Sequence, residues 1–419
     1  MATDGRGRRL SAVDPVGDLL RELAPRVLGP LARRHRDFAR AEDAVAEAVV
    51  DAVEAWRHGG VPEHPLGWLR TVAARRYVDQ VRADTARRRR ELALLDATPR
   101  DALVAPPPDA EPTRDDLLEL LFLCCHPALG PAAQLALTLR AVAGLTTAQI
   151  AAAFLVPEAT MGQRIVRAKQ RLREAGARFT PPPPAERAAR LTVVLHVLYL
   201  LFNEGYAASG GPRLHRVDLT GQALRLTRRL HDRLPDSGEV TGLLALMLLT
   251  EARAATRTGP DGELVPLTEQ DRSRWNRAAI AEGTALLTGS LSTAPLGPYQ
   301  VQAAIAAVHA EAPTAPATDW AQILALYELL ECLAPNPVVT LNRAVAVGEV
   351  HGPTAGLALL DEVAAGPLAG HHRLLAVRAH LLEQAGERAA AAAAWRGAAR
   401  QAGSVPEQRH LLRRAAHCE

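Results

Sequence analysis

The stretch GLTTAQIAAAFLVPEATMGQRIVRAKQRLREAG, residues 144–176, has the pattern of two short helices joined by a tight turn. Ile150 and Phe154 lie four residues apart and predict one buried face of a first helix over residues 147–154. Pro157 is typical of a helix start, so a second helix is expected directly after it. The apolar residues of that second helix recur at spacings of three and four, at Met161, Ile165, Ala168 and Leu172. The stretch therefore predicts a helix-turn-helix.

The other face of the second helix is polar and basic. A DNA recognition helix needs this division, because its apolar side packs on a partner helix while its basic side enters a major groove. An ordinary amphipathic helix pair with a basic face in solvent has the same pattern and remains the alternative. The residues expected to contact DNA are Thr160, Gln163, Arg164, Arg167 and Arg171, with Lys169 beside them.

The composition favours a large helical protein with a basic first half. Of 419 residues, 48% are apolar and only 4% are aromatic, which is sufficient for two or three helical domains. Residues 1–180 carry 27 Arg and Lys against 23 Asp and Glu, whereas residues 181–419 carry 22 against 23. This distribution favours nucleic acid as a partner of the first half and protein contacts for the second.

The sequence does not support a metal site, an enzyme active site, a signal peptide or a membrane span. The four cysteines, at positions 124, 125, 332 and 418, form no C-x-x-C pair, and Cys124-Cys125-His126 provides no four-ligand metal set. The sequence contains no nucleotide-binding loop and no nucleophile–base motif that would indicate an enzyme. The N-terminus lacks an apolar signal core, and no run of about 20 apolar residues predicts a membrane span. We therefore expect a cytoplasmic protein with no membrane partner, no metal and no cofactor.

Residues 14–36 are expected to form one helix or two short ones, and two longer helices are expected after them. The segment ARAEDAVAEAVVDAVEAW, residues 39–56, is strongly helical, and its outer face is expected to hold acidic residues. The segment PLGWLRTVAARRYVDQVR, residues 65–82, has core spacing at Trp68 and Tyr77 and exposed bases around it. The acidic residues of the first segment are Glu42, Asp43, Glu47, Asp51 and Glu54.

These motifs, in this order, resemble a group 4, extracytoplasmic-function sigma factor of bacterial RNA polymerase. The pattern WL-x-x-VA-x-x-x-x-x-D-x-x-R begins at Trp68 and ends at Arg82, and the pattern G-L-T-x-x-Q-I-A covers residues 144–151. Ala46 stands where members of the family often have glutamine. The recognition helix reads ATMGQR, residues 159–164, in place of the frequent G-T-V-x-S-R, so the resemblance does not imply a promoter sequence.

The resemblance implies roles for three groups of residues. The acidic helix is expected to dock on core RNA polymerase through Glu42, Asp43, Glu47 and Asp51. The melted −10 element is expected to lie along Gly60, Val61, Arg70, Arg75, Arg76 and Arg82. The double-stranded −35 element is expected to meet Thr160, Gln163, Arg164, Arg167, Lys169 and Arg171.

The second half predicts a helical array that follows a four-proline hinge at residues 181–184. Gly352 and Gly386 lie 34 residues apart, which is the length of a tetratricopeptide repeat. Segments such as LYLLFNEGY, residues 198–206, and DGELVPLTEQDRSRWN, residues 261–276, look like the sigma-factor subgroup with a long tetratricopeptide-like extension. Asn203, Glu204, Asp271, Arg272, Arg274 and Trp275 are candidate lining residues of a pocket in this extension. A satisfied polar network that fixes helix packing is the alternative.

The expected organisation is all-α. It comprises a sigma-2 domain at 12–90, a linker at 91–114, a sigma-4 helix-turn-helix domain at 115–178, a proline hinge at 179–186 and a helical-repeat extension at 187–419. The expected function is a sigma factor whose extension contacts and regulates or assists the sigma domains. A polymerase-independent helix-turn-helix regulator with a tetratricopeptide-like sensor is the alternative.

Overall fold

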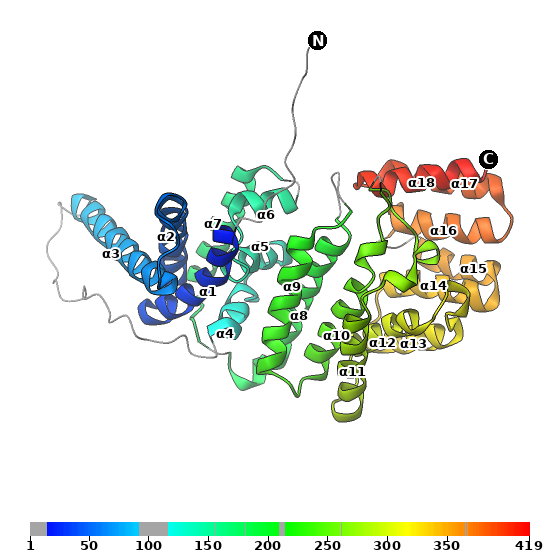
Figure 1. Ribbon diagram of the computed structural model, residues 1–419, viewed down its shortest axis with the longest axis horizontal. Coiled ribbons are helices and arrows are strands. Elements are labelled where there is room, and N and C mark those ends of the chain that lie inside the picture. The colour runs from blue at the N-terminus through cyan, green and yellow to red at the C-terminus, as the bar shows by residue number, and fades with distance from the viewer. Residues whose placement is uncertain are drawn as a thin grey trace, which may run out of the picture. The chain divides into compact units, whose positions relative to one another are not determined.

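The computed structural model of the chain describes residues 15–91, 116–154, 156–180, 182–208, 214–260, 262–364, 366 and 368–419. Within those ranges the chain forms eighteen α-helices and no β-strand, which confirms the all-α prediction (Figure 1). The chain divides into two compact units, residues 1–197 and 198–419. The predicted linker at 91–114 lies outside the described residues except at Glu91, where a helix ends.

The N-terminal unit has two groups of helices. The first group is α1 (Pro15–His35), α2 (Phe38–Gly59) and α3 (Pro65–Glu91), which pack on one another. The second group is α4 (Asp116–Cys124), α5 (Pro131–Ala141), α6 (Thr147–Ala153) and α7 (Glu158–Glu174). The groups are joined in space because α1 packs on α4 and α5, and α2 packs on α7.

The first group forms where the apolar periodicity placed it. Asp37 caps α2 by accepting a hydrogen bond from the backbone N–H of Arg40 at 3.1 Å. An apolar stripe on α2, which includes Ala44, Ala48 and Trp56, is buried against α1 and α3. Tyr77 of α3 is buried as predicted and stacks on His35, with ring centroids 4.0 Å apart.

Helix α8 (Pro184–Tyr206) starts inside the predicted four-proline segment and crosses the limit between the two units. Proline is favourable in the first helical turn because its missing N–H has no helical partner there. Near the start of α8, Arg190 donates a hydrogen bond to the carbonyl oxygen of Phe122 at 2.6 Å. The beginning of α8 is therefore tied to α4.

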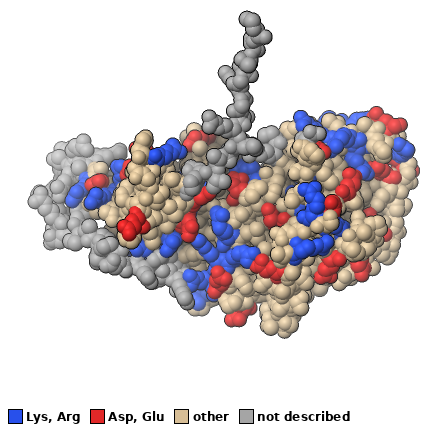
Figure 2. All heavy atoms as spheres, in the orientation of Figure 1, with Lys and Arg blue, Asp and Glu red and all other residues tan. Residues whose placement is uncertain are grey.

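The C-terminal unit consists of helices that pack largely on their neighbours in sequence (Figure 1). On the face shown in Figure 2, acidic and basic side chains alternate over this unit, in agreement with its nearly balanced charge. Its helices are the end of α8, α9 (Val217–Arg233), α10 (Gly238–Glu251), α11 (Arg277–Thr293), α12 (Pro298–Glu311), α13 (Trp320–Leu333), α14 (Pro337–His351), α15 (Pro353–Ala364), α16 (His372–Gln384), α17 (Arg388–Gln401) and α18 (Val405–His417). This agrees with the helical array that the sequence predicts for residues 187–419.

Between α10 and α11 the chain makes short 3₁₀ turns, at Ala254–Thr256, Leu267–Glu269 and Arg272–Arg274. The helix that follows starts at an Asn276 cap, whose side chain accepts from the N–H of Ala279 at 3.1 Å. Residues 262–276 are therefore a loop of short 3₁₀ turns that leads into α11.

Helices α10 and α12 approach closely at Gly242. A Cβ atom added at Gly242 would lie 2.6 Å from the backbone nitrogen of Gln300 and 2.8 Å from its Cγ. Gln300 is itself fully buried and donates to Ser290 Oγ at 3.2 Å. The crossing therefore depends on the absence of a side chain at position 242.

We expect Gly242→Ala to lower the free energy of unfolding of the C-terminal unit by about 1–3 kcal/mol, since an overpacked contact with backbone cannot relax easily. Gly289→Ala is the matched control, because Gly289 is a helical glycine with open space around its Cα. It should instead stabilise α11 by up to about 1 kcal/mol. Chemical unfolding followed by circular dichroism measures both, and equal effects at the two positions would contradict the packing described.

Candidate nucleic-acid interface

The helix-turn-helix is held at its start by a capping box. The Thr146 hydroxyl accepts from the N–H of Gln149 at 3.1 Å, and the Gln149 side chain accepts from the N–H of Thr146 at 2.9 Å. Gly144, which precedes this cap, has φ 68°, and a Cβ there would lie 2.8 Å from the carbonyl oxygen of Arg21. The glycine of the G-L-T motif thus allows both the turn and a close approach of α1.

The apolar face of α7 is buried as the sequence predicted. Met161, Ile165, Ala168 and Leu172 are all at most 5% exposed, and they pack α7 against α5 and α6. Their spacing leaves the opposite side of the helix toward solvent.

Five of the six residues expected to contact the −35 element share one face of α7. They line a shallow pocket of about 250 Å³ together with Ala133 of α5 and Ala168. Arg164 is half-buried and the other four are exposed. A row of three guanidinium groups flanked by a hydroxyl and an amide can contact both phosphates and base edges. The five residues are Thr160, Gln163, Arg164, Arg167 and Arg171.

Lys169 does not belong to that face, so its assignment to DNA contact is corrected. It is 7% exposed and donates to the carboxylate of Glu42 at 2.8 Å, and its Nζ also bonds a carboxylate oxygen of Asp43. The spacing along α7 is compatible with this burial, because Lys169 lies four residues after Ile165 and three before Leu172, at the edge of the apolar stripe. Lys169 is the only lysine in the chain.

Glu42 was expected on the exposed face of the acidic helix, and that expectation is wrong. Its side chain is 5% exposed and accepts from Arg140 Nε at 2.7 Å as well as from Lys169. Burial alone would raise the pKa of Glu42, but the charges and hydrogen bonds of Lys169 and Arg140 outweigh burial and lower the pKa. Glu42 lies four residues after Phe38 and three before Val45, again at the edge of an apolar stripe.

We call Glu42, Asp43, Arg140 and Lys169 the ion cluster. It joins α2 to α5 and α7 across about a hundred or more residues of sequence. Burial alone would lower the pKa of Lys169, but Glu42 and Asp43 raise it, so Lys169 stays charged. All charges of the cluster are therefore compensated by direct partners.

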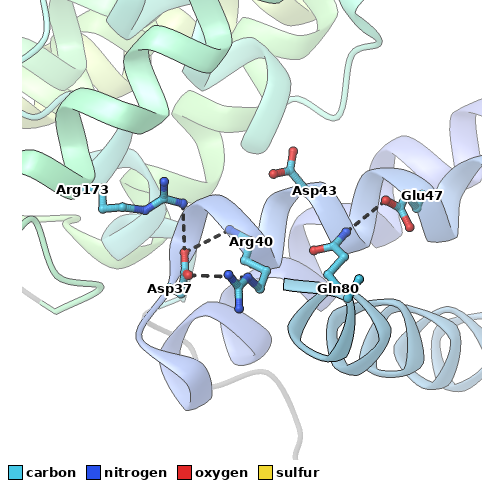
Figure 3. A pocket seen from close by; sticks show the side chains of 7 residues that line it. Asp37, Arg40, Asp43, Glu47, Gln80 and Arg173 are labelled. Atoms are coloured by element: carbon cyan, nitrogen blue, oxygen red, sulfur yellow. Dashed lines mark hydrogen bonds and ion pairs between the residues drawn. The ribbon is translucent and has the colours of Figure 1, made fainter. Parts of the chain in front are cut away.

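Two further ion pairs lie around the ion cluster. Arg33 of α1 contacts Glu119 of α4 at 3.1 Å, and Arg173 of α7 lies 3.8 Å from Asp37 at the start of α2. Beside the second pair is an open groove of about 640 Å³ between α2, α3 and α7, with charged side chains of both signs on its walls (Figure 3). Its lining residues are Asp37, Arg40, Asp43, Glu47, Gln80, Ala83 and Arg173.

The residues expected at the −10 element are only partly free for strand contact. Arg76 makes a two-bond ion pair with Asp51, at 2.8 and 2.7 Å, although the two were assigned to different partners. Arg70 is half-buried, whereas Arg75 and Arg82 are exposed on α3. Gly60 and Val61 are exposed in the loop between α2 and α3, with Val61 46% exposed.

The candidate pocket residues of the extension separate into two sets. Arg272 and Trp275 are buried and in contact, with the guanidinium carbon 4.9 Å from the ring centroid. Asp271 and Arg274 are exposed, and Asp271 accepts from the Ser273 N–H at 3.0 Å. Asn203 and Glu204 are half-buried on α8. The exposed pair therefore lies outside the buried network around Arg272.

Three of the four cysteines are buried, and Cys332 is exposed. Cys124 and Cys125 are fully buried, and burial raises the pKa of Cys125 to about 12. Both thiols are therefore protonated. In the described residues, no three His, Cys, Asp or Glu side chains gather as a metal site would require. None of the described helices combines the length and the apolar character that a membrane crossing demands.

Comparisons with known proteins agree with the architecture of the N-terminal unit. Residues 119–172 match the family model described as sigma-70, region 4, and residues 190–291 match a family of unknown function, DUF6596. The chain is 44% identical over 365 residues to "Uncharacterized protein R00370" of Rhizobium meliloti (strain 1021), and the match covers 86% of each chain. No solved structure matches the chain.

We expect Lys169→Met to loosen α7 from α2, because it leaves the buried Glu42 carboxylate with Arg140 alone. Breaking a buried ion pair typically costs about 3–5 kcal/mol, so the opening free energy of α7 amides in hydrogen exchange should fall by an amount of that order. Arg167→Met is the matched control on the exposed face of the same helix and should change it by less than about 0.5 kcal/mol. Equal protection in the two variants would contradict the role of the ion cluster.

The same contact should weaken in acid. Because the pKa of Glu42 is lowered in the folded chain, its contribution is complete above the ordinary value of 4.5 and is lost as the pH falls through the lowered pKa. Protection of α7 should therefore decline below pH 4.5 in the natural chain. In Glu42→Gln, which lacks the titrating carboxyl, this decline should be reduced.

Proposed function

Because the chain belongs to the same family as the Rhizobium meliloti protein and carries a sigma-70 region 4 domain, we propose that it is a sigma factor that binds core RNA polymerase and directs promoter-specific initiation. The observation that supports this most directly is the basic face of α7 within the region 4 match. Region 4 in this role reads double-stranded DNA through the second helix of its helix-turn-helix. The resemblance to the extracytoplasmic-function group supports the same role.

In this proposal the contacts to the −35 element come from five residues of α7. Arg164 and Arg167 lie at the centre of the face, where a guanidinium group can pair with a guanine edge, and Arg171 at its end is suited to a phosphate. Thr160 and Gln163 provide uncharged polar contacts near the start of the helix. Lys169 contributes indirectly, since it fixes α7 on α2.

The −10 contacts are assigned to the exposed part of the α3 face and its loop. Arg75 and Arg82 are placed to hold strand phosphates, and Gly60 and Val61 lie at the loop that would meet an unpaired base. Arg76 can join them only if Asp51 releases it, because the two form a bidentate pair.

Polymerase docking is assigned to the acidic surface of α2 that region 4 leaves exposed. Glu47 is exposed; it accepts a hydrogen bond from Gln80 at 3.0 Å and lies 3.9 Å from Arg76. Asp43 is exposed but shared with Lys169, and Glu42 is covered. A basic polymerase surface that engages the whole acidic helix must therefore displace Lys169 and separate region 4 from α2. Such separation also gives the two promoter-binding domains the freedom to reach two distant DNA elements.

The extension is proposed to regulate or assist the sigma domains through a tetratricopeptide-like helical array. Tethering supports this, since a weak contact between segments of one chain acts at an effective concentration of about millimolar. The alternative function, a polymerase-independent DNA-binding regulator, is distinguished by run-off transcription. A sigma factor restores initiation to purified core polymerase, and a regulator of that kind does not.

We expect Arg164→Ala and Arg167→Ala each to weaken binding of holoenzyme to promoter fragments by about ten- to a hundredfold, which corresponds to 1–3 kcal/mol for a lost base contact. Arg178→Ala is the control, because this exposed arginine follows α7 and does not line the pocket. Fluorescence anisotropy at several salt concentrations separates the two kinds of contact, since a lost phosphate contact also lowers the salt slope by about one. Unchanged binding by both variants would exclude the basic face of α7 as the surface that recognises the −35 element.

We expect Glu47→Lys to reduce the affinity for core polymerase, because it reverses an exposed charge in the middle of the acidic surface. Glu22→Lys, an exposed charge reversal on α1, is the matched control and should leave affinity unchanged. Native gel titration of full-length chain with core enzyme measures both. Equal affinities of the two variants would remove α2 from the docking site while leaving the DNA assignment to stand.

A further inference from the structure

The tyrosines of this chain are concentrated in one place. The sequence has only five, and four of them belong to the C-terminal unit, on α8, α12 and α13. The rings of Tyr199 and Tyr299 lie 5.6 Å apart, and burial together with the neighbouring Tyr199 raises the pKa of Tyr327 to about 12. Tyr199, Tyr299 and Tyr327 are all partly buried. In a chain that is only 4% aromatic, four of the five tyrosines therefore lie on three helices of one unit.

Arginines without acidic partners lie beside these rings. Arg253 donates to the Tyr206 hydroxyl at 2.9 Å, and the guanidinium carbon of Arg257 lies 3.6 Å from the Tyr206 ring centroid. Arg272 donates to the carbonyl oxygens of His309 and Ala312, both at 2.7 Å. Among the residues that the structure describes, none of the three arginines forms an ion pair with a carboxylate.

Two of these arginines are fixed structural groups and one is not. Arg257 and Arg272 are at most 9% exposed, and each is anchored on backbone carbonyls and stacked on an aromatic ring. Arg253 is half-exposed and is held only through its Nε and its contact with Tyr206. Its two terminal amines have no hydrogen-bond partner in the described part of the chain.

The electrostatics around Arg253 are strongly cationic. Its charge lowers the pKa of Arg257, of Arg272 and of His309, whose pKa falls to about 4 through burial and the two neighbouring arginines. The one carboxylate that acts on Arg257, Glu251, is already engaged by Thr220 at 3.2 Å and by His215 at 3.4 Å. His309 is therefore neutral at physiological pH.

Placing three guanidinium groups together in a partly buried site is costly unless an anion compensates them. We propose that Arg253, Tyr206, Tyr199, Tyr327 and His309 form a binding site for a small organic anion. The carboxylate or phosphate group of that ligand pairs with the terminal amines of Arg253, which match a two-oxygen group in a planar fork. Its apolar or aromatic body lies against the partly buried tyrosine rings.

The site lies in the extension, and much of it falls in the segment that matches the family of unknown function. Arg253, Tyr199 and Tyr206 are within residues 190–291, whereas Tyr327 and His309 come from the helices that follow. The inference stands independently of the proposed sigma-factor function, because neither the DNA face of α7 nor the acidic surface of α2 enters it.

Isothermal titration calorimetry of the full-length chain tests the site with three probes at constant ionic strength: inorganic phosphate, phenyl phosphate and benzoate. We expect one of the aromatic anions to bind saturably and at least tenfold more tightly than inorganic phosphate. Phenyl phosphate and benzoate together distinguish a phosphate-bearing from a carboxylate-bearing ligand. Absence of saturable binding by all three probes would overturn the proposal.

Variants identify the residue that binds the anion. Arg253→Gln should weaken binding about tenfold or more, since it removes a charge-assisted contact. Arg253→Lys, which keeps the charge but loses the fork, should give an intermediate affinity. Arg233→Gln, at an exposed arginine at the end of α9, is the matched control and should bind as the natural chain does. Equal loss in the glutamine variants at 253 and 233 would overturn the assignment.

A measurement on the natural chain guards against misfolded variants. An anion bound beside Arg253 and Arg272 offsets the charges that keep His309 neutral, so the pKa of His309 should rise from about 4 when the tighter aromatic probe is added. The imidazole carbon-bound proton shifts in NMR report this change. A probe that binds but leaves His309 unmoved would place the ligand elsewhere.

Discussion

The buried carboxylate of Glu42 is the constraint on which the arrangement of the N-terminal unit depends. A lone carboxylate at 5% exposure would be protonated or would force the helices apart, and here Arg140 and Lys169 keep it charged. These two partners come from α5 and α7, so α2 can hold its charge only where region 4 presents both bases. The two donors also fix how α2 lies on α5 and α7, because the Glu42 carboxylate can accept from both of them in only one orientation.

Because Glu42 needs Lys169 as a partner, α7 has three faces, whereas a simple amphipathic helix has two. Met161 and Ile165 hold it on α5 and α6, Lys169 fixes it on α2, and the arginines around Arg167 remain free toward solvent. A lysine suits the middle position because its flexible stem carries a point charge to two carboxylates at once, whereas an arginine fork would favour one. The single lysine of the chain stands at that position.

Local periodicity was enough to predict what depends on neighbours in sequence, but not what depends on distant partners. The two helices of the helix-turn-helix, the apolar face of α7 and its row of polar residues follow from spacings of three and four. Glu42 occupies the edge of such a stripe, where the pattern alone permits either exposure or burial, and the deciding bases lie 98 and 127 residues away. The bond between Arg76 and Asp51 and the grouping of four tyrosines between residues 199 and 327 escaped prediction for the same reason.

The polar character of the contact between region 4 and α2 also bears on how it separates. An apolar contact of the same extent would expose apolar surface on opening, and that surface would associate non-specifically with other molecules. When the ion cluster opens, the attraction between its charges is lost, but each charge is hydrated again. Hydration therefore offsets part of the free energy of opening. Because each half of the separated contact is a well-solvated charged surface, a basic partner can take the place of Lys169 and Arg140 on the same carboxylates. The closed arrangement is therefore specific, and its carboxylates can also accept other bases, which is the property that the proposed docking of polymerase on α2 requires.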